Sequence, residues 1–396
     1  MLSLDKVFNA QTVLKNIIRE TNVVRSYGIA QNCELFLKPE NLQITGSFKV
    51  RGSAYKIAML SEEEKQRGVI ACSAGNHAQG VALAATKNGI RSLICLPDSA
   101  PISKVEATKG FGAQVCLVEG CYDDAYQKAL ELKESEGYTF VHPFDDENVI
   151  AGQGTIALEI LNDLDNIDAI VVPIGGGGLI SGIAYTVKQI RPSVKVYGVQ
   201  ATGAPSMYNS IHNGKIDSLE SVSTIADGIA VKKPGENTYN LVKEYVDDIA
   251  VVSDDEVASA ILALIEKQKM IAEGAGAAAV AAVMFNKFDL EGKRVVAVVS
   301  GGNIDVTSLS RVIDRGLLKS GRSSSLLIEL IDKPGQLKHI SRIIADCGGN
   351  VTGVHYEKGN TESVNGCYLR IEMETRDFEH VNLITQSLRN EGFKIV

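Results

Sequence analysis

The chain has 396 residues, enough for about two or three domains with a sizeable hydrophobic core. Its composition, 45% hydrophobic and 22% charged, is typical of a globular protein, and its net charge of −8 argues against nucleic-acid binding. No apolar run could span a bilayer, the N-terminus lacks a signal sequence, and the seven cysteines include no Cys-x-x-Cys pair, so we expect a cytoplasmic protein with reduced thiols.

The N-terminal part of the chain predicts helices separated by one strand. Residues 5–20 have helical apolar spacing, and residues 33–38 are typical of a strand. A helix over residues 48–60 follows Gly46 and Ser47, which we interpret as a turn and an N-cap residue.

Repeated units of strand, turn, helix and strand make up the middle of the chain. The predicted strands are 68–72, 92–97, 114–118, 169–174, 194–199 and 294–299. The predicted helices are an alanine-rich one after residue 80, one ending near residue 110, and 122–135, 179–190, 254–270 and 274–285. Continuous apolar strands alternating with helices predict two lobes of α/β structure, each an open parallel sheet covered on both faces.

The composition changes to that of a linker at residues 320–324, and a separate module follows. Its predicted order is strand 326–331, helix 335–347, strand 351–357, a hairpin loop with Gly359 and Gly366, strand 367–374, helix 378–390 and strand 393–396. This βαββαβ order predicts a ferredoxin-like α/β sandwich.

Lys49 is placed in the first turn of its predicted helix, where the helix dipole disfavours a cation by roughly 0.3–1 kcal/mol. No acidic residue between Glu40 and Glu62 offsets this field locally. A lysine that prefers to be neutral can attack a carbonyl or accept a proton. An ordinary solvated lysine is the alternative interpretation.

Four glycines at 175–178 stand at the predicted carboxyl end of a strand, where open parallel sheets bind ligands. Their backbone N–H groups at a helix start suit a phosphate group. A dinucleotide site is disfavoured, because Ile180 takes the place of the third glycine and the next strand ends in Val199-Gln200 without an acid. A turn needed only for packing remains the alternative.

Two other strand ends carry polar groups. In residues 73–80, Asn76 could bond a phenolic or carboxylate oxygen, and backbone N–H groups could hold an anion. His77 could either cap or pack locally or take part in proton transfer, so we assign it no catalytic role. Ser300 could bond a neutral ring nitrogen or simply cap a turn.

Together and in this order, the four motifs resemble those of the fold-type-II (tryptophan synthase β-like) pyridoxal-phosphate enzymes, and most of all the threonine dehydratases, or threonine ammonia-lyases. The resemblance covers about residues 5–318. It identifies 46–52 with the Schiff-base motif, 73–77 with the asparagine loop, 175–179 with the phosphate loop and 300–303 with the pyridine-nitrogen motif. The tail resembles an ACT domain, a small regulatory module. The implied domains are a catalytic domain at 1–319 (small lobe about 50–145, large lobe about 1–49 and 146–319) and an ACT domain at 325–396.

The resemblance also implies site residues for the cofactor, pyridoxal 5'-phosphate. Lys49, next to Phe48, would hold it covalently and take the substrate Cα proton, Asn76 would bond its ring hydroxyl, and Ser300 would meet its ring nitrogen. The phosphate would be bound by backbone N–H groups of Gly175, Gly176, Gly177, Gly178 and Leu179. The loop for the substrate carboxylate would be Ser73, Ala74, Gly75, Asn76 and His77. Because serine does not keep the ring nitrogen protonated as a carboxylate would, prompt loss of a β-hydroxyl is favoured.

The resemblance implies deamination of L-threonine to 2-oxobutanoate and ammonia, with L-serine as a slower substrate. Serine racemases share the pattern but carry a second serine where this chain has Ala74, which argues against racemisation. Their metal-binding acids are also missing, since Gln200, Ala204 and Ser206 occupy that region. The six histidines are dispersed, so we expect no divalent metal and leave a monovalent cation open.

Several alternatives stay open at this point. The enzyme could be a lyase specific for serine or hydroxyaspartate, or the chain could be an amino-acid-binding regulator with an idle catalytic half. The tail could bind an effector such as isoleucine, valine or AMP, or serve only in assembly. We expect a homo-oligomer, a dimer or a tetramer. Whether the role is isoleucine biosynthesis or threonine catabolism is undecided.

Overall fold

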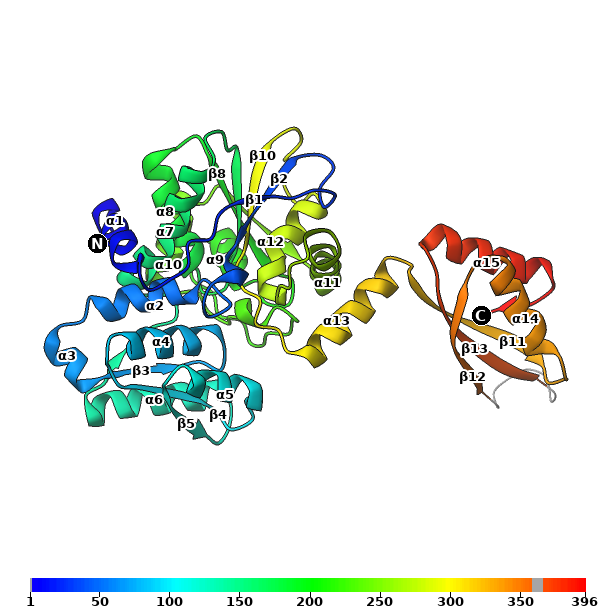
Figure 1. Cartoon of the computed structure of the whole chain (residues 1–396), viewed down its shortest axis with the longest axis horizontal. Coiled ribbons are helices and arrows are strands. Elements are labelled where there is room, and N and C mark those ends of the chain that lie inside the picture. Colours follow the sequence, from blue (N-terminus) through cyan, green and yellow to red (C-terminus); the bar gives the residue numbers. More distant parts are fainter. Residues whose placement is uncertain (1, 358–365) are drawn as a thin grey trace. The chain divides into compact units, whose positions relative to one another are not determined.

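The computed structural model describes residues 2–357 and 366–396, and the chain divides after Val306 into two compact units (Figure 1). The first unit holds two mainly parallel sheets, and the second holds one antiparallel sheet. Helix α13 (Val306–Lys319) falls in the second unit from Thr307 onward, and the predicted end of the catalytic domain at residue 319 stays a prediction. No described helix is long and apolar enough to cross a membrane.

The larger sheet of the first unit has six strands in the order β1-β2-β10-β7-β8-β9. Its neighbouring strands are parallel except β1 and β2. The strands are β1 (Val24–Arg25), β2 (Glu34–Pro39), β7 (Ala169–Pro173), β8 (Lys195–Ala201), β9 (Asp248–Val252) and β10 (Arg294–Val299). The central strand β7 is buried along its whole length, as a strand covered on both faces should be.

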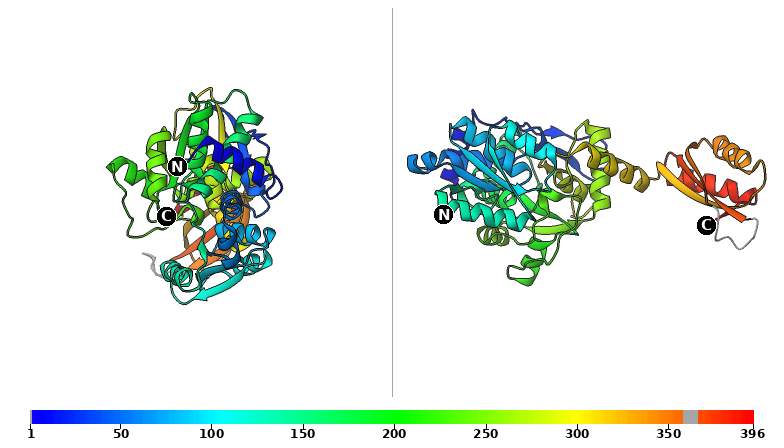
Figure 2. Two further views of the ribbon diagram at one scale, coloured as in Figure 1. Left: turned by 90° about the vertical axis from the view of Figure 1, so that its left-hand side faces the viewer. Right: turned by 90° about the horizontal axis from the view of Figure 1, so that it is seen from below.

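Helices cover both faces of this sheet (Figures 1 and 2). An apolar cluster joins α7 and α8 to Ile170, Val172, Val296 and Val298 of the sheet, while α12 packs along β7, β8, β9 and β10. The helical elements of this lobe are α1 (Leu4–Leu14), η1 (Glu40–Leu42), α7 (Glu147–Asp163), α8 (Gly178–Ile190), α9 (Ser206–Asn213), η2 (Asp227–Ile229), α10 (Glu236–Tyr245), α11 (Asp254–Ala263), η3 (Leu264–Gln268) and α12 (Gly274–Met284).

The smaller sheet has four parallel strands in the order β5-β4-β3-β6. They are β3 (Val69–Cys72), β4 (Ser92–Pro97), β5 (Gln114–Val118) and β6 (Thr139–Phe140), accompanied by α2 (Lys49–Ala58), α3 (Glu62–Arg67), α4 (Asn76–Lys87), α5 (Ile102–Gly110) and α6 (Tyr122–Glu136). Helix α2 packs against α4 on one side and α7 on the other. It therefore joins the two lobes.

The second unit has the predicted ferredoxin-like order. Its antiparallel sheet runs β12-β13-β11-β14, and α14 and α15 cover one face through a single apolar core. Its elements are β11 (Ser323–Ile331), α14 (Gln336–Asp346), β12 (Asn350–Glu357), β13 (Gly366–Glu374), α15 (Phe378–Asn390) and β14 (Lys394–Ile395). The predicted hairpin glycine Gly359 lies outside the described residues.

Two predicted helices are shorter in the structure. The one expected over residues 5–20 ends at Leu14, where Ile17 and Ile18 turn back to its carbonyl group. The one expected over 254–270 continues from α11 into a π-helical turn, η3, and stops at Lys269, whose φ of 58° is left-handed. A left-handed residue ends a helix because its carbonyl leaves the helical direction.

A buried ion cluster fixes the first turns of α2 in the larger lobe. The Arg51 guanidinium is fully buried and donates to both oxygens of Glu40, at 2.8 and 2.7 Å, and of Glu159, at 2.5 and 2.8 Å. Lys38 Nζ donates to Glu159 at 2.5 Å. Burial opposes ionisation of Glu159, but its hydrogen bonds with Arg51 and Lys38 and their charges hold its pKa below the ordinary value.

Arg51→Ala should therefore lower the free energy of unfolding by about 3–5 kcal/mol, because it leaves two buried carboxylates with one cation. The measurement is urea unfolding of the full chain, followed by far-ultraviolet circular dichroism. Lys109→Ala, which breaks an exposed pair with Glu106, is the control and should leave the unfolding curve unchanged. Equal unfolding midpoints for the two variants would contradict the assignment.

Candidate active site

The three polar turns predicted from the sequence all follow the carboxyl ends of parallel strands. Residues 73–77 follow β3, residues 175–178 follow β7, and residues 300–303 follow β10. Helix α2 begins with Lys49. Strand ends of this kind are where open parallel sheets bind ligands.

A short antiparallel pairing brings the Lys49 and Ser300 motifs together. The Phe48 N–H donates to the Ser300 carbonyl at 3.1 Å, and the Gly302 N–H donates to the Gly46 carbonyl at 2.8 Å. Ser47 and Gly301 form the bridge between these bonds. Because Lys49 follows Phe48 directly, its backbone is fixed beside the end of β10.

Gly46 forms the predicted turn, but Ser47 is not the predicted cap. Gly46 has a φ of 69°, and a Cβ there would lie 2.3 Å from Asn303 Oδ1, so no other residue fits without a shift. Phe48 is the N-cap residue of α2, and the buried Ser47 hydroxyl has no hydrogen-bond partner among the described residues. Backbone pairing with Gly301 turns Ser47 away from the capping position.

The Lys49 ammonium is disfavoured by its surroundings. Burial lowers its pKa to about 8, and the nearby Glu273 carboxylate opposes this shift. Nζ donates to the Pro143 carbonyl at 2.8 Å and lies 5.3 Å from the centre of the Phe48 ring. The helix dipole also predicts a lysine that prefers its neutral form. Desolvation is the main cause here.

The asparagine loop adopts a fixed polar arrangement at the start of α4. Asn76 Nδ2 donates to Glu273 Oε1 at 2.7 Å, and Asn76 Oδ1 accepts from Asn303 Nδ2 at 2.8 Å. The Ser73 hydroxyl accepts from the Gly75 N–H at 3.2 Å, and a Cβ at Gly75 would meet nothing within 4 Å. Open space at this loop leaves room for a bound molecule. Ala74 is half-buried and packs against the core of the smaller lobe.

His77 packs locally, in line with the first of its two interpretations. Its ring is buried, Nε2 lies 2.8 Å from the Val141 carbonyl, and Nδ1 lies 3.4 Å from the Ser53 hydroxyl. Burial, together with the charge of Lys49, lowers its pKa to about 3. The ring is therefore neutral near neutral pH.

The glycines at 176–178 are required by packing. A Cβ would lie 2.5 Å from the Phe144 ring at Gly176 and 2.9 Å from the Phe144 backbone at Gly178. Gly177 has a φ of 100°, and a Cβ there would lie 2.7 Å from Thr238. Close packing thus accounts for three of the four glycines, which is what the packing alternative for this turn predicts.

The same turn also offers free backbone donors. Gly177 is the N-cap of α8, and its carbonyl accepts the first helical bond from Ser181 at 2.9 Å. The N–H groups of residues 175–179, the predicted phosphate loop, have no protein acceptor among the described residues. Donors at a helix start suit a phosphate group. The Leu179 side chain is buried in the core of the larger lobe, so only its N–H is available.

Ser300 lies at the end of β10 with 3% of its surface exposed, and its hydroxyl donates to the Ala275 carbonyl at 3.3 Å. This long bond can be exchanged for a better acceptor such as a ring nitrogen. Phe48 packs against the core of the larger lobe and flanks Lys49.

Sequence reasoning missed the most strongly perturbed acid of the site. Glu273 precedes α12, and burial raises its pKa to about 7, while a hydrogen bond from Asn76 lowers it. The loop residues Pro143 and Phe144, which contact Lys49 and the glycine turn, were missed as well. A carboxylate directly before a small-residue helix was a signal for Glu273. Nothing local pointed to the loop.

These residues fit pyridoxal phosphate as the sequence predicted. A lysine with a lowered pKa, free N–H groups at a helix start and an exchangeable serine hydroxyl match the cofactor's aldehyde, phosphate and ring nitrogen. In the region where a metal was considered, the Gln200 amide donates to the Ile174 carbonyl at 3.1 Å and accepts from the Tyr208 N–H at 2.8 Å. The absence of a divalent metal stays a prediction.

Glu273→Gln should lower the pKa of Lys49 below about 8, because the carboxylate is the charge that favours the ammonium form. The pKa can be measured in cofactor-free protein from the pH dependence of Lys49 acylation, followed by peptide mass spectrometry. Glu62→Gln, on exposed helix α3, is the control and should leave the curve in place. A Lys49 curve unmoved by Glu273→Gln would refute this electrostatic picture.

Comparison with known proteins agrees with the geometry. A family model described as pyridoxal-phosphate dependent enzyme matches residues 14–301. The L-threonine ammonia-lyase of Thermotoga maritima is 49% identical over 100% of this chain and 99% of its own. The processed form of threonine deaminase isoform 2 from Solanum lycopersicum has a TM-score of 0.76 at 36% identity, covering 80% of this chain and 90% of that one. Maize serine racemase has a TM-score of 0.75 at 35% identity, covering 80% and 98%. The chain belongs to the family of pyridoxal-phosphate-dependent enzymes, and pyridoxal phosphate is its cofactor.

Proposed function

We propose that the protein is a threonine ammonia-lyase that eliminates water from L-threonine and, on hydrolysis, releases 2-oxobutanoate and ammonia. The observation that carries the proposal is the desolvated Lys49, with a pKa of about 8, paired through the backbone with the Ser300 turn. A relative that spans the whole chain is named for this activity. L-Serine, one methyl group smaller, would be converted to pyruvate more slowly.

The residues of the chain divide the work as follows. When bound, pyridoxal phosphate supplies an electron sink for the pair left behind when the Cα proton departs. Lys49 holds the cofactor and takes that proton, which its lowered pKa suits. The free N–H groups of 175–179 bind the phosphate, and the loop 73–77 binds the substrate carboxylate through its backbone. Ser300 meets the ring nitrogen as a neutral partner.

Ala74 favours elimination over racemisation. Racemisation needs an acid or base on the face of the substrate opposite Lys49, and the methyl group of Ala74 can neither give nor take a proton. The similarity of the fold to both a threonine deaminase and a serine racemase does not separate the two reactions. The alanine at position 74 supports elimination.

Lys49→Ala should abolish both the visible absorption band of the bound cofactor and threonine turnover, because it removes the amine that holds the cofactor and takes the proton. Absorbance of the purified protein and 2-oxobutanoate formation are measured side by side. Lys65→Ala, which changes a partly exposed lysine of α3, is the matched control and should retain both. Turnover that survives Lys49→Ala would sink the assignment.

Specificity constants for L-threonine, L-serine and hydroxyaspartate, measured on the unmodified enzyme, separate the proposal from its alternatives. We expect the order threonine above serine above hydroxyaspartate. A serine or hydroxyaspartate preference would make the protein a lyase for that substrate. Full cofactor binding with no turnover would favour an amino-acid-binding regulator.

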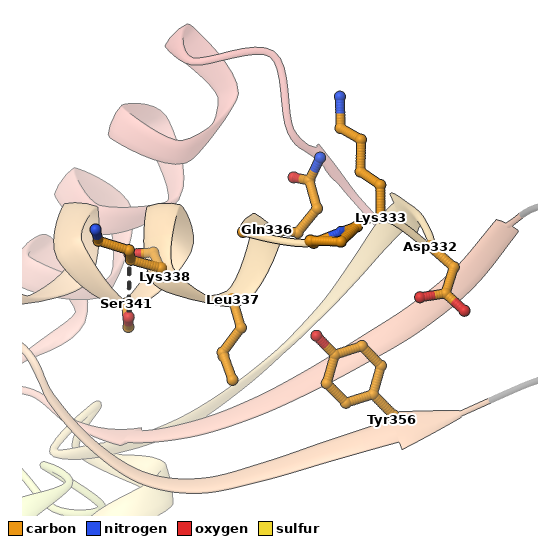
Figure 3. Close-up of a pocket in the computed structure, with 9 residues that line it drawn as sticks. Asp332, Lys333, Gln336, Leu337, Lys338, Ser341 and Tyr356 are labelled. Carbon is orange, nitrogen blue, oxygen red and sulfur yellow. Dashed lines mark hydrogen bonds between the residues drawn. The ribbon is translucent and has the colours of Figure 1, made fainter.

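The second unit offers a pocket at the start of α14 (Figure 3). Its lining residues are Asp332, Lys333, Pro334, Gly335, Gln336, Leu337, Lys338, Ser341 and Tyr356. Tyr356 extends toward the turn that precedes α14, while Lys333 points away from it (Figure 3). Gly335 is the N-cap residue, with a φ of 95° that favours glycine.

We propose that the second unit is an ACT domain and that this pocket takes a small effector, with isoleucine, valine and AMP as candidates. N–H groups at the start of α14 suit a carboxylate or phosphate, and Asp332 suits an ammonium group. The alternative is a module that only assembles the protein into a homo-oligomer, a dimer or a tetramer. We also propose that the protein is located in the cytoplasm.

At least one of the three effectors should shift the threonine saturation curve of the full-length enzyme, and Asp332→Ala should weaken that response about tenfold through loss of one charge-assisted hydrogen bond. Arg342→Ala, an exposed position further along α14, is the matched control. A chain truncated after Lys319 should not respond. A truncated enzyme that responds like the full chain would contradict an effector site in the tail.

A further inference from the structure

Three side chains and one backbone carbonyl form a continuous hydrogen-bonded row beside Lys49. Asn303 Nδ2 donates to the Thr45 carbonyl at 2.7 Å and to Asn76 Oδ1 at 2.8 Å. Asn76 Nδ2 then donates to Glu273 Oε1 at 2.7 Å. The row starts at a backbone carbonyl group and ends at the half-buried carboxyl group of Glu273.

The starting carbonyl fixes the direction of every bond in the row. A carbonyl can only accept, so the Asn303 atom that faces Thr45 must be its NH₂ group. The same NH₂ group contacts Asn76, so the atom it meets there must be the Asn76 oxygen. The Asn76 NH₂ group is thereby directed to Glu273, whose carboxylate readily accepts a hydrogen bond.

Two glycines make room for this row. A Cβ at Gly46 would lie 2.3 Å from Asn303 Oδ1, and a Cβ at Gly301 would lie 2.3 Å from Glu273 Oε1 and 3.2 Å from Asn76 Nδ2. Both glycines belong to the backbone pairing between the Lys49 and Ser300 motifs. Both glycines therefore serve the side-chain row as well as the backbone pairing.

We propose that Asn303 and Glu273 are positioning residues that fix Asn76 as a hydrogen-bond donor, and never an acceptor, toward the ring oxygen of pyridoxal phosphate. The Asn76 oxygen is occupied by Asn303, and one N–H is taken by Glu273, so the second N–H is the group left for the cofactor. A donor stabilises the anionic form of that oxygen over the neutral hydroxyl. The inference rests on the proposed function, in which Asn76 meets that oxygen.

Two isosteric variants should differ in their effect on the balance between the anionic and neutral forms of the cofactor's ring oxygen. Asn303→Asp removes both donors, so Asn76 can turn its oxygen toward the cofactor, and the neutral hydroxyl form should gain about tenfold over the anionic one. Glu273→Gln keeps an acceptor for Asn76, so the direction of the row should be retained, and the loss of a negative charge should not favour the neutral hydroxyl form. A role in folding alone would not distinguish the ends of the row in this way.

The balance is measured in the holoenzyme from the ratio of the visible band, which reports the anionic oxygen, to the near-ultraviolet band, across a pH titration. The cofactor Kd is determined alongside. We expect the near-ultraviolet band to grow with Asn303→Asp and not with Glu273→Gln. An unchanged ratio in Asn303→Asp, or equal growth in both variants, would overturn the proposal.

If Asn303→Asp does not fold, Asn303→Ala provides the test, because it frees Asn76 to rotate without adding a charge. Growth of the near-ultraviolet band, smaller than that expected for Asn303→Asp, supports the proposal. An unchanged ratio of the visible to the near-ultraviolet band overturns it. Failure of the proposed function looks different. The unmodified protein would then bind no cofactor at Lys49 and show neither band.

Discussion

The pairing of residues 46–48 with residues 300–302 is the constraint on which the site depends. It ties the loop after β2 to the loop after β10, whose strands are parallel neighbours, so both loops leave the sheet at the same edge. The start of α2 is thereby held at the carboxyl ends of the strands. Lys49, Ser300 and the Asn303 side chain owe their mutual placement to this one contact, and Gly46 and Gly301 are the residues that permit it.

Two cations in the first turn of α2 differ in how their desolvation is compensated: Arg51 is fully buried, and Lys49 is half-buried. Arg51 donates hydrogen bonds to two carboxylates, so its charge is fully compensated. This ion cluster anchors the helix that joins the lobes. Lys49 donates to a backbone carbonyl and has only a more remote carboxylate nearby. Desolvation therefore outweighs the attraction of that charge, and the pKa of Lys49 falls to about 8. The difference in compensation makes one residue structural and the other reactive.

Most of the fold could be predicted from local patterns, because short segments of the sequence are enough to identify the apolar strands, the glycine turns and the βαββαβ order of the tail. What could not be predicted comes from contacts between distant segments. Ser47 has the right composition for a cap, but its pairing with Gly301 removes it from that position. Glu273 and Asn303 reach Asn76 only in the folded chain, and the lowered pKa of Lys49 comes from burial, which a helix-dipole argument does not contain.

The central claim is that Lys49 carries the cofactor at the junction of these segments. Borohydride reduction of the purified holoenzyme converts the lysine–cofactor linkage into a stable amine, which proteolysis and mass spectrometry can locate. The account predicts a pyridoxyl group on the peptide that contains Lys49. A pyridoxyl group on a different lysine, or on none, would contradict it.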